Sequence, residues 1–323
     1  MNFSKSIKVF AIFAASFLLF SCKEELPKRT VRIAIQPSAG FIPMYVARYS
    51  NLIENALAEK NVTVEWQDFE SDPVINDSLS ADLSDIGLLG DVPAILSLMN
   101  TNKMYLVGIA SRGAEAYAVL AKPNDTSIKS LKDIKNKRIA TVFGSTGHEI
   151  VKNILDKNGL TFDDIEFVNI SAADFEYALR VGTADAIVTW EPNISRLVDS
   201  DKAKIISTGK ELNTSGVNSF IVRESYLAAG NADIIKEILN QYKIASEQLA
   251  SLDQKVLLKL CFVLNINTDQ ISAVTNKYDF SVNISKNDIN SLKETMSFLI
   301  SINSLNKNFQ IENKIYSSCL PSN

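Results

Sequence analysis

Hydrophobic and polar positions alternate between two patterns over the first two thirds of the chain. Short apolar runs typical of strands lie at residues 31–35, 62–69, 84–89, 104–110, 117–123, 138–143, 165–170, 185–190 and 203–208. Apolar residues recur at helical spacing at 43–58, 93–100, 146–157, 172–181 and 192–198. Strands separated by single helices predict βαβ units and mainly parallel sheets.

The pattern changes near Glu224. Long helices are predicted from there on, at residues 231–252, 254–264 and 287–305, with few strands between them. No internal repeat is recognised. Two α/β regions followed by a helix-rich end predict a two-lobed body, in which ligands bind beyond the carboxyl ends of the strands.

The first 22 residues have the pattern of an export signal. Lys5 and Lys8 precede the apolar run "VFAIFAASFLLF", which is too short to span a bilayer. The following "LFSC" resembles the lipobox of bacterial lipoproteins, which predicts cleavage before Cys22 and its acylation. Residues 23–30 are then a polar tether, and the chain is exported and lipid-anchored to the bacterial cell envelope. An ordinary signal peptide with an incidental cysteine stays open as the alternative.

Composition narrows the classes of function. The chain has 323 residues, of which 46% are apolar, so it can fill a sizeable core. Its net charge of −4 argues against a nucleic-acid partner, because nucleic-acid binders usually carry a basic face. Export permits a disulfide between Cys261 and Cys319, but two cysteines without a pattern leave this pairing undecided.

The only histidine, His148, lies in "FGSTGHEIVKNIL", where a strand turns into a helix. Thr146 and Glu149 fit a T-x-x-E capping box, so the helix is expected to begin at Thr146. Its N-terminus offers unpaired N–H groups, and Ser145, Thr146 and His148 add side-chain donors beside them. This turn is a candidate anion site. An ordinary capped helix is the open alternative.

Three further turns repeat this strand-to-helix arrangement. The candidate residues in them are Gln36, Ser38, Gly40 and Phe41 in "IAIQPSAGFIP", Gly90 and Asp91 in "IGLLGDVPAIL", and Trp190 and Glu191 in "VTWEPNI". Asp91 is expected to cap its own helix. Trp190 either covers the apolar part of a small ligand or lies in the core. Glu191 is either a cap or a partner for a ligand's amine.

Catalysis is not supported by any motif. Ser145 would need a base and an orienting acid, and "GSTGH" is no nucleophile elbow. The sequence contains no recognisable zinc, redox or phosphate-loop motif. We therefore expect no enzyme activity, no cofactor and no metal.

The motifs together resemble a known family. The G-D-x-P turn, the "KSLKDIKNKRIA" lead-in to a G-S-x-x-H helix start, and the W-[DE]-P turn are similar in order and spacing to the aliphatic-sulfonate, nitrate and taurine binding proteins of ABC importers. The resemblance covers roughly residues 31–250. This group also includes binders of pyrimidine precursors of thiamine.

The resemblance implies a type II periplasmic-binding-protein fold, with two α/β lobes, a hinge and a helical C-terminal region. Residues 31–112 and 217–323 would form the first lobe, and residues 113–216 the second. The ligand would lie in the cleft between them, in contact with the four turns. Arg112, at the crossover, would pair with an anionic head group or bind Glu115.

The expected function is that of a monomeric solute-binding lipoprotein. It would capture a small organic anion or zwitterion, similar to a sulfonate, taurine or nitrate, and deliver it to an ABC permease in the membrane. Three alternatives stay open: a binder of a thiamine pyrimidine precursor, an enzyme on the same fold, and an envelope sensor or adhesin.

Overall fold

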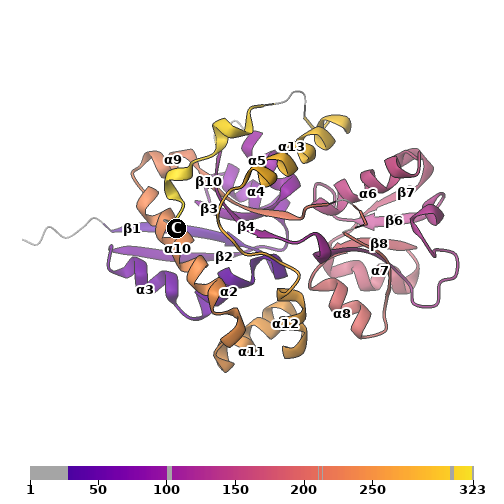
Figure 1. The fold of residues 1–323 in the computed structure, drawn as a ribbon, viewed down its shortest axis with the longest axis horizontal. Helices are drawn as coiled ribbons and strands as arrows, with labels where there is room; N and C mark the ends of the chain where they lie inside the picture. The colour runs from indigo at the N-terminus through magenta and orange to yellow at the C-terminus, as the bar shows by residue number, and fades with distance from the viewer. Residues whose placement is uncertain (1–27, 100–103, 210, 213, 306–308, 322–323) are drawn as a thin grey trace, which may run out of the picture.

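A computed structural model describes residues 28–99, 104–209, 211–212, 214–305 and 309–321. The predicted leader, residues 1–22 with Cys22, lies outside the described residues. The chain forms two lobes, each built on a five-stranded sheet surrounded by helices (Figure 1). The first strand begins at Arg29, inside the segment predicted as a tether.

The first lobe contains a sheet in the order β2-β1-β3-β10-β4. Its strands are β1 (Arg29–Ile35), β2 (Val62–Asp68), β3 (Ile86–Gly90), β4 (Met104–Arg112) and β10 (Val217–Arg223). The strand β10 returns from the second lobe and lies antiparallel between β3 and β4. It was not predicted, because polar Asn218 and Ser219 shorten its apolar run to residues 220–222.

The second lobe contains a sheet in the order β7-β6-β8-β5-β9. Its strands are β5 (Tyr117–Ala121), β6 (Arg138–Thr141), β7 (Glu166–Asn169), β8 (Ala186–Trp190) and β9 (Lys204–Thr208). The prediction of parallel pairing is correct for β1 with β2 and β3, and for β6 with β7 and β8. It is wrong for β5, which pairs antiparallel with both β8 and β9.

Both faces of each sheet are buried. In the first lobe, Ile33 packs into one apolar cluster while its neighbour Ala34 packs into another on the opposite face. In the second, Val119 and Leu120 divide in the same way. Successive strand residues point to opposite faces, so a central strand such as β5 is apolar throughout rather than alternating.

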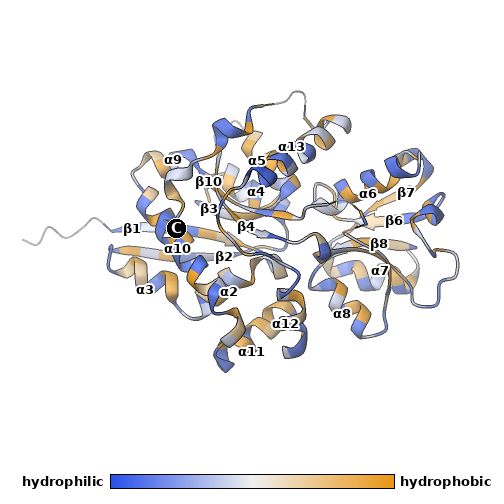
Figure 2. Cartoon of the chain, viewed as in Figure 1, coloured by the Kyte–Doolittle hydropathy of each residue, from blue (hydrophilic) through white to orange (hydrophobic). Residues whose placement is uncertain are grey.

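The helices cover these faces. They are α2 (Ile42–Tyr49), α3 (Leu52–Ala58), α4 (Asp72–Ser80), α5 (Asp91–Met99), α6 (Thr146–Lys157), α7 (Phe175–Val181), α8 (Asn193–Asp199), α9 (Glu224–Ala228), α10 (Ala232–Glu247), α11 (Gln254–Leu264), α12 (Thr268–Thr275) and α13 (Lys286–Ser301). They mix hydrophobic and hydrophilic residues along their length (Figure 2). In the described part of the chain, none is both long and apolar enough for a membrane span.

One helix prediction needs correction, and some helices were missed. The helix expected over 43–58 is two helices, because Asn51 between them adopts a left-handed conformation with φ of 53°. The helices α4, α9 and α12 were not predicted. The helix α12 bridges the lobes, since the Gln270 side chain donates to the Asp199 carboxylate of the second lobe at 2.7 Å.

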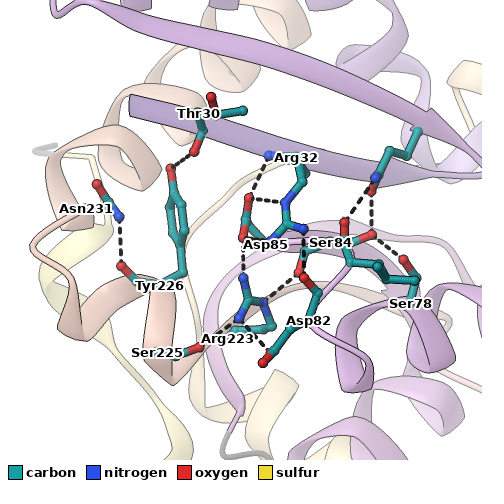
Figure 3. Close-up of polar contacts among 12 residues, drawn as sticks. Thr30, Arg32, Ser78, Asp82, Ser84, Asp85, Arg223, Ser225, Tyr226 and Asn231 are labelled. Carbon is teal, nitrogen blue, oxygen red and sulfur yellow. Dashed lines mark hydrogen bonds and ion pairs between the residues drawn. The ribbon is translucent and has the colours of Figure 1, made fainter. Parts of the chain in front are cut away.

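The same arrangement of one arginine and one aspartate, here called a clasp, occurs once in each lobe. It is an internal repeat that was not recognised from the sequence. In the first lobe, Arg32 on β1 binds Asp85, which directly precedes β3, through its backbone N–H at 2.8 Å and its guanidinium at 2.7 Å (Figure 3). In the second, Arg138 on β6 binds Asp185 before β8 through the same groups, at 2.9 and 2.6 Å. Each clasp holds two parallel strands in register at the edge away from the strand ends discussed below.

Candidate functional site

A cavity lies where strand ends of both sheets meet. Its empty volume is about 280 Å³. It is reached by the ends of β1, β3 and β8, by the starts of β5 and β10, and by the first turns of α4 and α6. The residues that line it are Gln36, Ser38, Phe41, Asp72, Gly90, Tyr117, Ser145, Thr146, Trp190 and Asn218.

All four predicted turns contribute to this lining. The candidate residues that face the cavity are Gln36, Ser38, Phe41, Gly90, Ser145, Thr146 and Trp190. Trp190 also packs edge-to-face on Phe175, with ring centroids 6.0 Å apart, so it serves the core and the cavity together. Chain segments separated by more than a hundred residues therefore meet at one small space.

The cavity also contains three residues that the sequence reasoning missed: Asp72, Tyr117 and Asn218. Asp72 is the first residue of α4, after the N-cap position Ser71 and before a proline. This Ser-Asp-Pro order, with buried Ile75 and Leu79 four residues apart, is a helix-start signature that could have revealed α4. No comparable signal marks Tyr117 or Asn218.

Asp72 is the charged side chain of the lining. One carboxylate oxygen accepts an N–H from the side chain of Gln36, and the other accepts the backbone N–H of Gly90 at 3.2 Å. The residue keeps some exposed surface, but protein surrounds its carboxyl group, and this desolvation raises its pKa to about 7. The hydrogen bond from Gly90 opposes this shift, and the nearby charge of Asp91 adds to it.

Glycines allow the close approach of polar groups at the cavity wall. A Cβ on Gly40 would come within 2.8 Å of the Asn218 amide nitrogen and 3.0 Å of the Ser111 hydroxyl. These two side chains are themselves joined by a hydrogen bond of 2.9 Å. Gly40 thus contributes space for Asn218 rather than a side chain of its own.

The helix α6 begins at Thr146 as predicted, but its capping box is wrong. Ser145 occupies the N-cap position without a side-chain cap, and its hydroxyl donates to the Val142 carbonyl at 2.6 Å. Thr146 and Glu149 turn to the other lobe instead: the Thr146 hydroxyl donates to Asp91 at 2.5 Å, and Glu149 accepts from Thr295 at 3.0 Å. Tertiary partners have replaced the local cap, so Ser145 provides no side-chain cap to the first turn of α6, which borders the cavity.

Asp91 lies behind the cavity wall. Its carboxylate accepts the N–H of Val92 at 2.7 Å, so it binds its own helix, as expected from the sequence. Burial raises its pKa to about 6, although the hydrogen bonds from Thr146 and Val92 hold it down. Burial and the charge of Asp91 also raise the pKa of Glu149 well above its usual value.

Besides Gly40 and Asp91, three more predicted site residues lie outside the cavity lining: Arg112, Glu191 and His148. The Arg112 guanidinium binds Asp288 at 2.6 and 2.7 Å and two backbone carbonyls, which ties the crossover to the C-terminal region. Glu191 is fully buried and accepts from the N–H and hydroxyl of Ser195, both at 3.0 Å, and from Lys277. It therefore caps α8, one of the two roles predicted for it.

His148 belongs to an aromatic cluster. Its ring packs between those of Phe143, Phe162, Phe167 and Phe298, with centroids 4.9–5.6 Å apart. Its Nδ1 accepts the backbone N–H of Gly144 at 3.3 Å. Desolvation lowers its pKa to about 4, so the ring is neutral at physiological pH.

The two cysteines left open by the sequence are free thiols. Cys319 is buried, with its sulfur 3.6 Å from the Ala232 carbonyl oxygen, while Cys261 is half-buried on α11.

A larger groove of about 950 Å³ runs between α6 and α13. Its walls are mid-helix side chains such as Lys152, Asp156 and Glu294, and Lys152 is already paired with Asp156. The smaller cavity is the better ligand site, because strand ends and a helix N-terminus converge on it.

Contacts across the cavity hold the lobes together. Besides the Thr146–Asp91 and Thr295–Glu149 hydrogen bonds, the Ala39 N–H donates to the Glu191 carbonyl at 3.3 Å. The site is a small, partly open pocket with one carboxylate, several neutral polar side chains and three aromatic side chains. Such a pocket can bind a small polar molecule by hydrogen bonds, charge and stacking.

Comparison with known proteins gives the same picture. Residues 93–247 match the family model described as NMT1/THI5 like. A protein of Escherichia coli (strain K12) named as an aliphatic sulfonates-binding protein is 27% identical over 226 residues, which cover 70% of this chain and 69% of that protein. The taurine-binding periplasmic protein of the same organism is 25% identical, over 64% of this chain and 62% of its own.

The fold also matches solved structures. The alkanesulfonate-binding protein SsuA from Xanthomonas axonopodis pv. citri, bound to MOPS, superimposes with a TM-score of 0.79 at 22% identity, over 89% of this chain and 98% of that one. The expected type II periplasmic-binding-protein fold is therefore confirmed. These relatives are named as binding proteins, in agreement with the expectation that the chain is not an enzyme. The comparisons confirm the resemblance that the motifs indicated: this chain is similar to aliphatic-sulfonate-binding and taurine-binding proteins.

Proposed function

We propose that this protein is the solute-binding lipoprotein of an ABC importer, which captures a small organic anion or zwitterion between its lobes and delivers it to the permease. The observation that carries the proposal is the convergence of all four turns on one cavity between two sheets. The names of the relatives, which bind aliphatic sulfonates and taurine, support the same class of ligand.

The free energies expected of such contacts are of the size that micromolar binding requires. Micromolar binding requires about −8 kcal/mol. The uncapped N-terminus of α6 contributes up to ~2 kcal/mol to a partly buried anion, and each charge-assisted hydrogen bond about 1.5–3 kcal/mol. The hydroxyl of Ser38 borders the same space, as does the first turn of α6 with its backbone N–H groups. Several such contacts exceed the cost of immobilising a small ligand.

A second candidate ligand is a flat aminopyrimidine related to a thiamine precursor. The observation in its favour is the aromatic part of the lining, Phe41, Tyr117 and Trp190, which suits a stacked ring. Enzyme and sensor functions have no such observation behind them.

In this proposal residues 31–112 and 217–323 form the first lobe, and residues 113–216 form the second. A hinge motion between the lobes opens the cavity for the ligand. The protein acts as a monomer, anchored to the bacterial cell envelope on the periplasmic or extracytoplasmic face. The acyl chains on Cys22 hold it there, and residues that follow serve as the tether.

Calorimetric titration with taurine, alkanesulfonates, nitrate and aminopyrimidines tests the binding function. Binding of at least one with micromolar affinity is expected, and mass spectrometry of small molecules released from the denatured protein checks the result independently. The absence of binding in the titration, together with no small molecule released from the denatured protein, counts against the proposal. For the anchor, Cys22→Ser is expected to move the protein from the membrane to the soluble fraction.

A further inference from the structure

We infer that the ligand carries an amino group, which binds the carboxylate of Asp72 inside the cavity. The inference rests on the proposed function and deepens it, because it selects a zwitterion or an aminopyrimidine over a simple anion such as nitrate or an alkanesulfonate.

The first argument is the charge of the lining. Among the described residues, Asp72 alone brings a charge to the cavity, and no Lys, Arg or His lines it. The remaining side chains of the lining are neutral hydroxyls, amides and aromatic rings. A negatively charged ligand without a donor group would meet a carboxylate with no cation beside it.

The second argument is the unfinished coordination of this carboxylate. Gln36 and the Gly90 N–H hold its two oxygens in place, one donor to each. A carboxylate has about four acceptor positions, so acceptor capacity remains after these two bonds. Buried charges in proteins are normally paired. An ammonium group in the cavity supplies both the missing charge and the missing donors, and a neutral amino group supplies the donors.

The third argument is the second buried carboxylate behind the wall. Asp91 is held by Val92 and Thr146 and does not line the cavity, yet its charge acts on Asp72. The negative potential at the Asp72 end is therefore strengthened. This favours a cationic group there and disfavours an anionic one.

The acidic group of such a ligand has a binding position close to Asp72. A Cβ on Gly90 would lie 3.0 Å from the Thr146 hydroxyl and 3.2 Å from the Asp72 carboxylate, so both side chains face the same short stretch of the cavity. The first turn of α6, which starts at Thr146, presents N–H groups to an anion. A short molecule with an amino group and an acidic group matches these two ends.

Two pairs of probes, which differ only in the amino group, test the inference by calorimetry at pH 7.5. Taurine is compared with propane-1-sulfonate, in which a methyl group replaces the ammonium, and 4-aminopyrimidine with 4-methylpyrimidine. We expect the amino member of one pair to bind roughly 10- to 100-fold more tightly, the effect of a charge-assisted hydrogen bond. The pair that binds separates the zwitterion from the aminopyrimidine.

The variant Asp72→Asn is expected to reduce this ratio to near one while leaving the affinity of the methyl member unchanged or higher. Asp77→Asn, the same change at an exposed position of α4, is the matched control and should keep the wild-type ratio. The wild-type comparison requires no variant, so it stands even where Asp72→Asn fails to fold.

Tighter or equal binding of the methyl members overturns the inference and leaves the proposed function intact. A ratio that persists in Asp72→Asn overturns it as well. Failure of all four probes, with no amine-bearing molecule released from the denatured protein, counts against the proposed function together with the inference.

Discussion

The hydroxyl of Thr146 donates a 2.5 Å hydrogen bond to the carboxylate of Asp91, from the first turn of a helix in one lobe to the first turn of a helix in the other. The bond is buried. It joins the lobes at the edge of the cavity and replaces the local cap that the sequence predicts for Thr146.

Thr146→Val removes this hydroxyl with little change of shape. We expect the free energy of unfolding to fall by about 1–3 kcal/mol, because Asp91 stays buried with one fewer donor. The loss should be smaller at pH 5, since the pKa of Asp91 is about 6 and its protonated form needs the donor less. Urea denaturation at pH 5 and 8 measures both effects. Thr63→Val, at an exposed position of β2, should change neither.

Asp72 should make the ligand-free protein less stable as the pH rises. Its pKa is raised from 3.8 in the unfolded chain to about 7, so the folded state holds the proton more tightly. The stability that this proton provides is complete below pH 4 and is lost as the pH rises to about 7, by about 2–4 kcal/mol. In Asp72→Asn this loss is absent. Urea denaturation between pH 4 and 8 should therefore give a wild-type-minus-variant difference that falls with pH, and a constant difference would contradict the cavity's electrostatics.

His148 should have the opposite pH dependence. Its pKa is lowered from 6.5 to about 4 in the folded state, so the proton binds more tightly to the unfolded chain. The stability provided by the neutral ring is present above pH 6.5 and is lost as the pH falls toward 4, by about 1–2 kcal/mol after allowance for its partial exposure.

The variant His148→Asn isolates this effect, because an amide oxygen can still accept the Gly144 N–H but does not titrate in this range. The stability advantage of the wild type over the variant should shrink between pH 6.5 and 4. An advantage that stays level across this interval would show that the imidazole is not desolvated by the surrounding phenylalanines.

The two clasps should differ in strength although their geometry is the same. Asp85 binds both Arg32 and Arg223, and its side chain is 3% exposed, whereas Asp185 binds Arg138 and is 24% exposed. Breaking a buried pair costs about 3–5 kcal/mol, and breaking an exposed pair up to ~1 kcal/mol. We expect Asp85→Asn to approach the first value and Asp185→Asn the second in denaturant unfolding. Equal losses would mean that burial does not decide the strength of the clasp.

Much of the fold could be predicted from local pattern. The helix start at Thr146, the helix at 254–264 and the strand ends that carry the four turns follow from apolar periodicity, glycines and prolines within a few residues of each position. The strand β10 escaped prediction because polar Asn218 and Ser219 leave it only a short apolar run, residues 220–222. Its place beside β3 depends on a return of the chain from the other lobe, which no local window contains.

The residues of the cavity also fall into two groups, those that local sequence predicts and those that it does not. Turn chemistry is local, so the positions of Gln36, Gly90, Ser145 and Trp190 at strand ends could be predicted from the sequence. That Asp72 faces this space while His148 and Arg112 turn away from it is a result of the three-dimensional packing. A side chain's surroundings depend on which helices pack together, and here that packing joins residues as far apart as Asp91 and Thr146, whose meeting no spacing along the chain expresses.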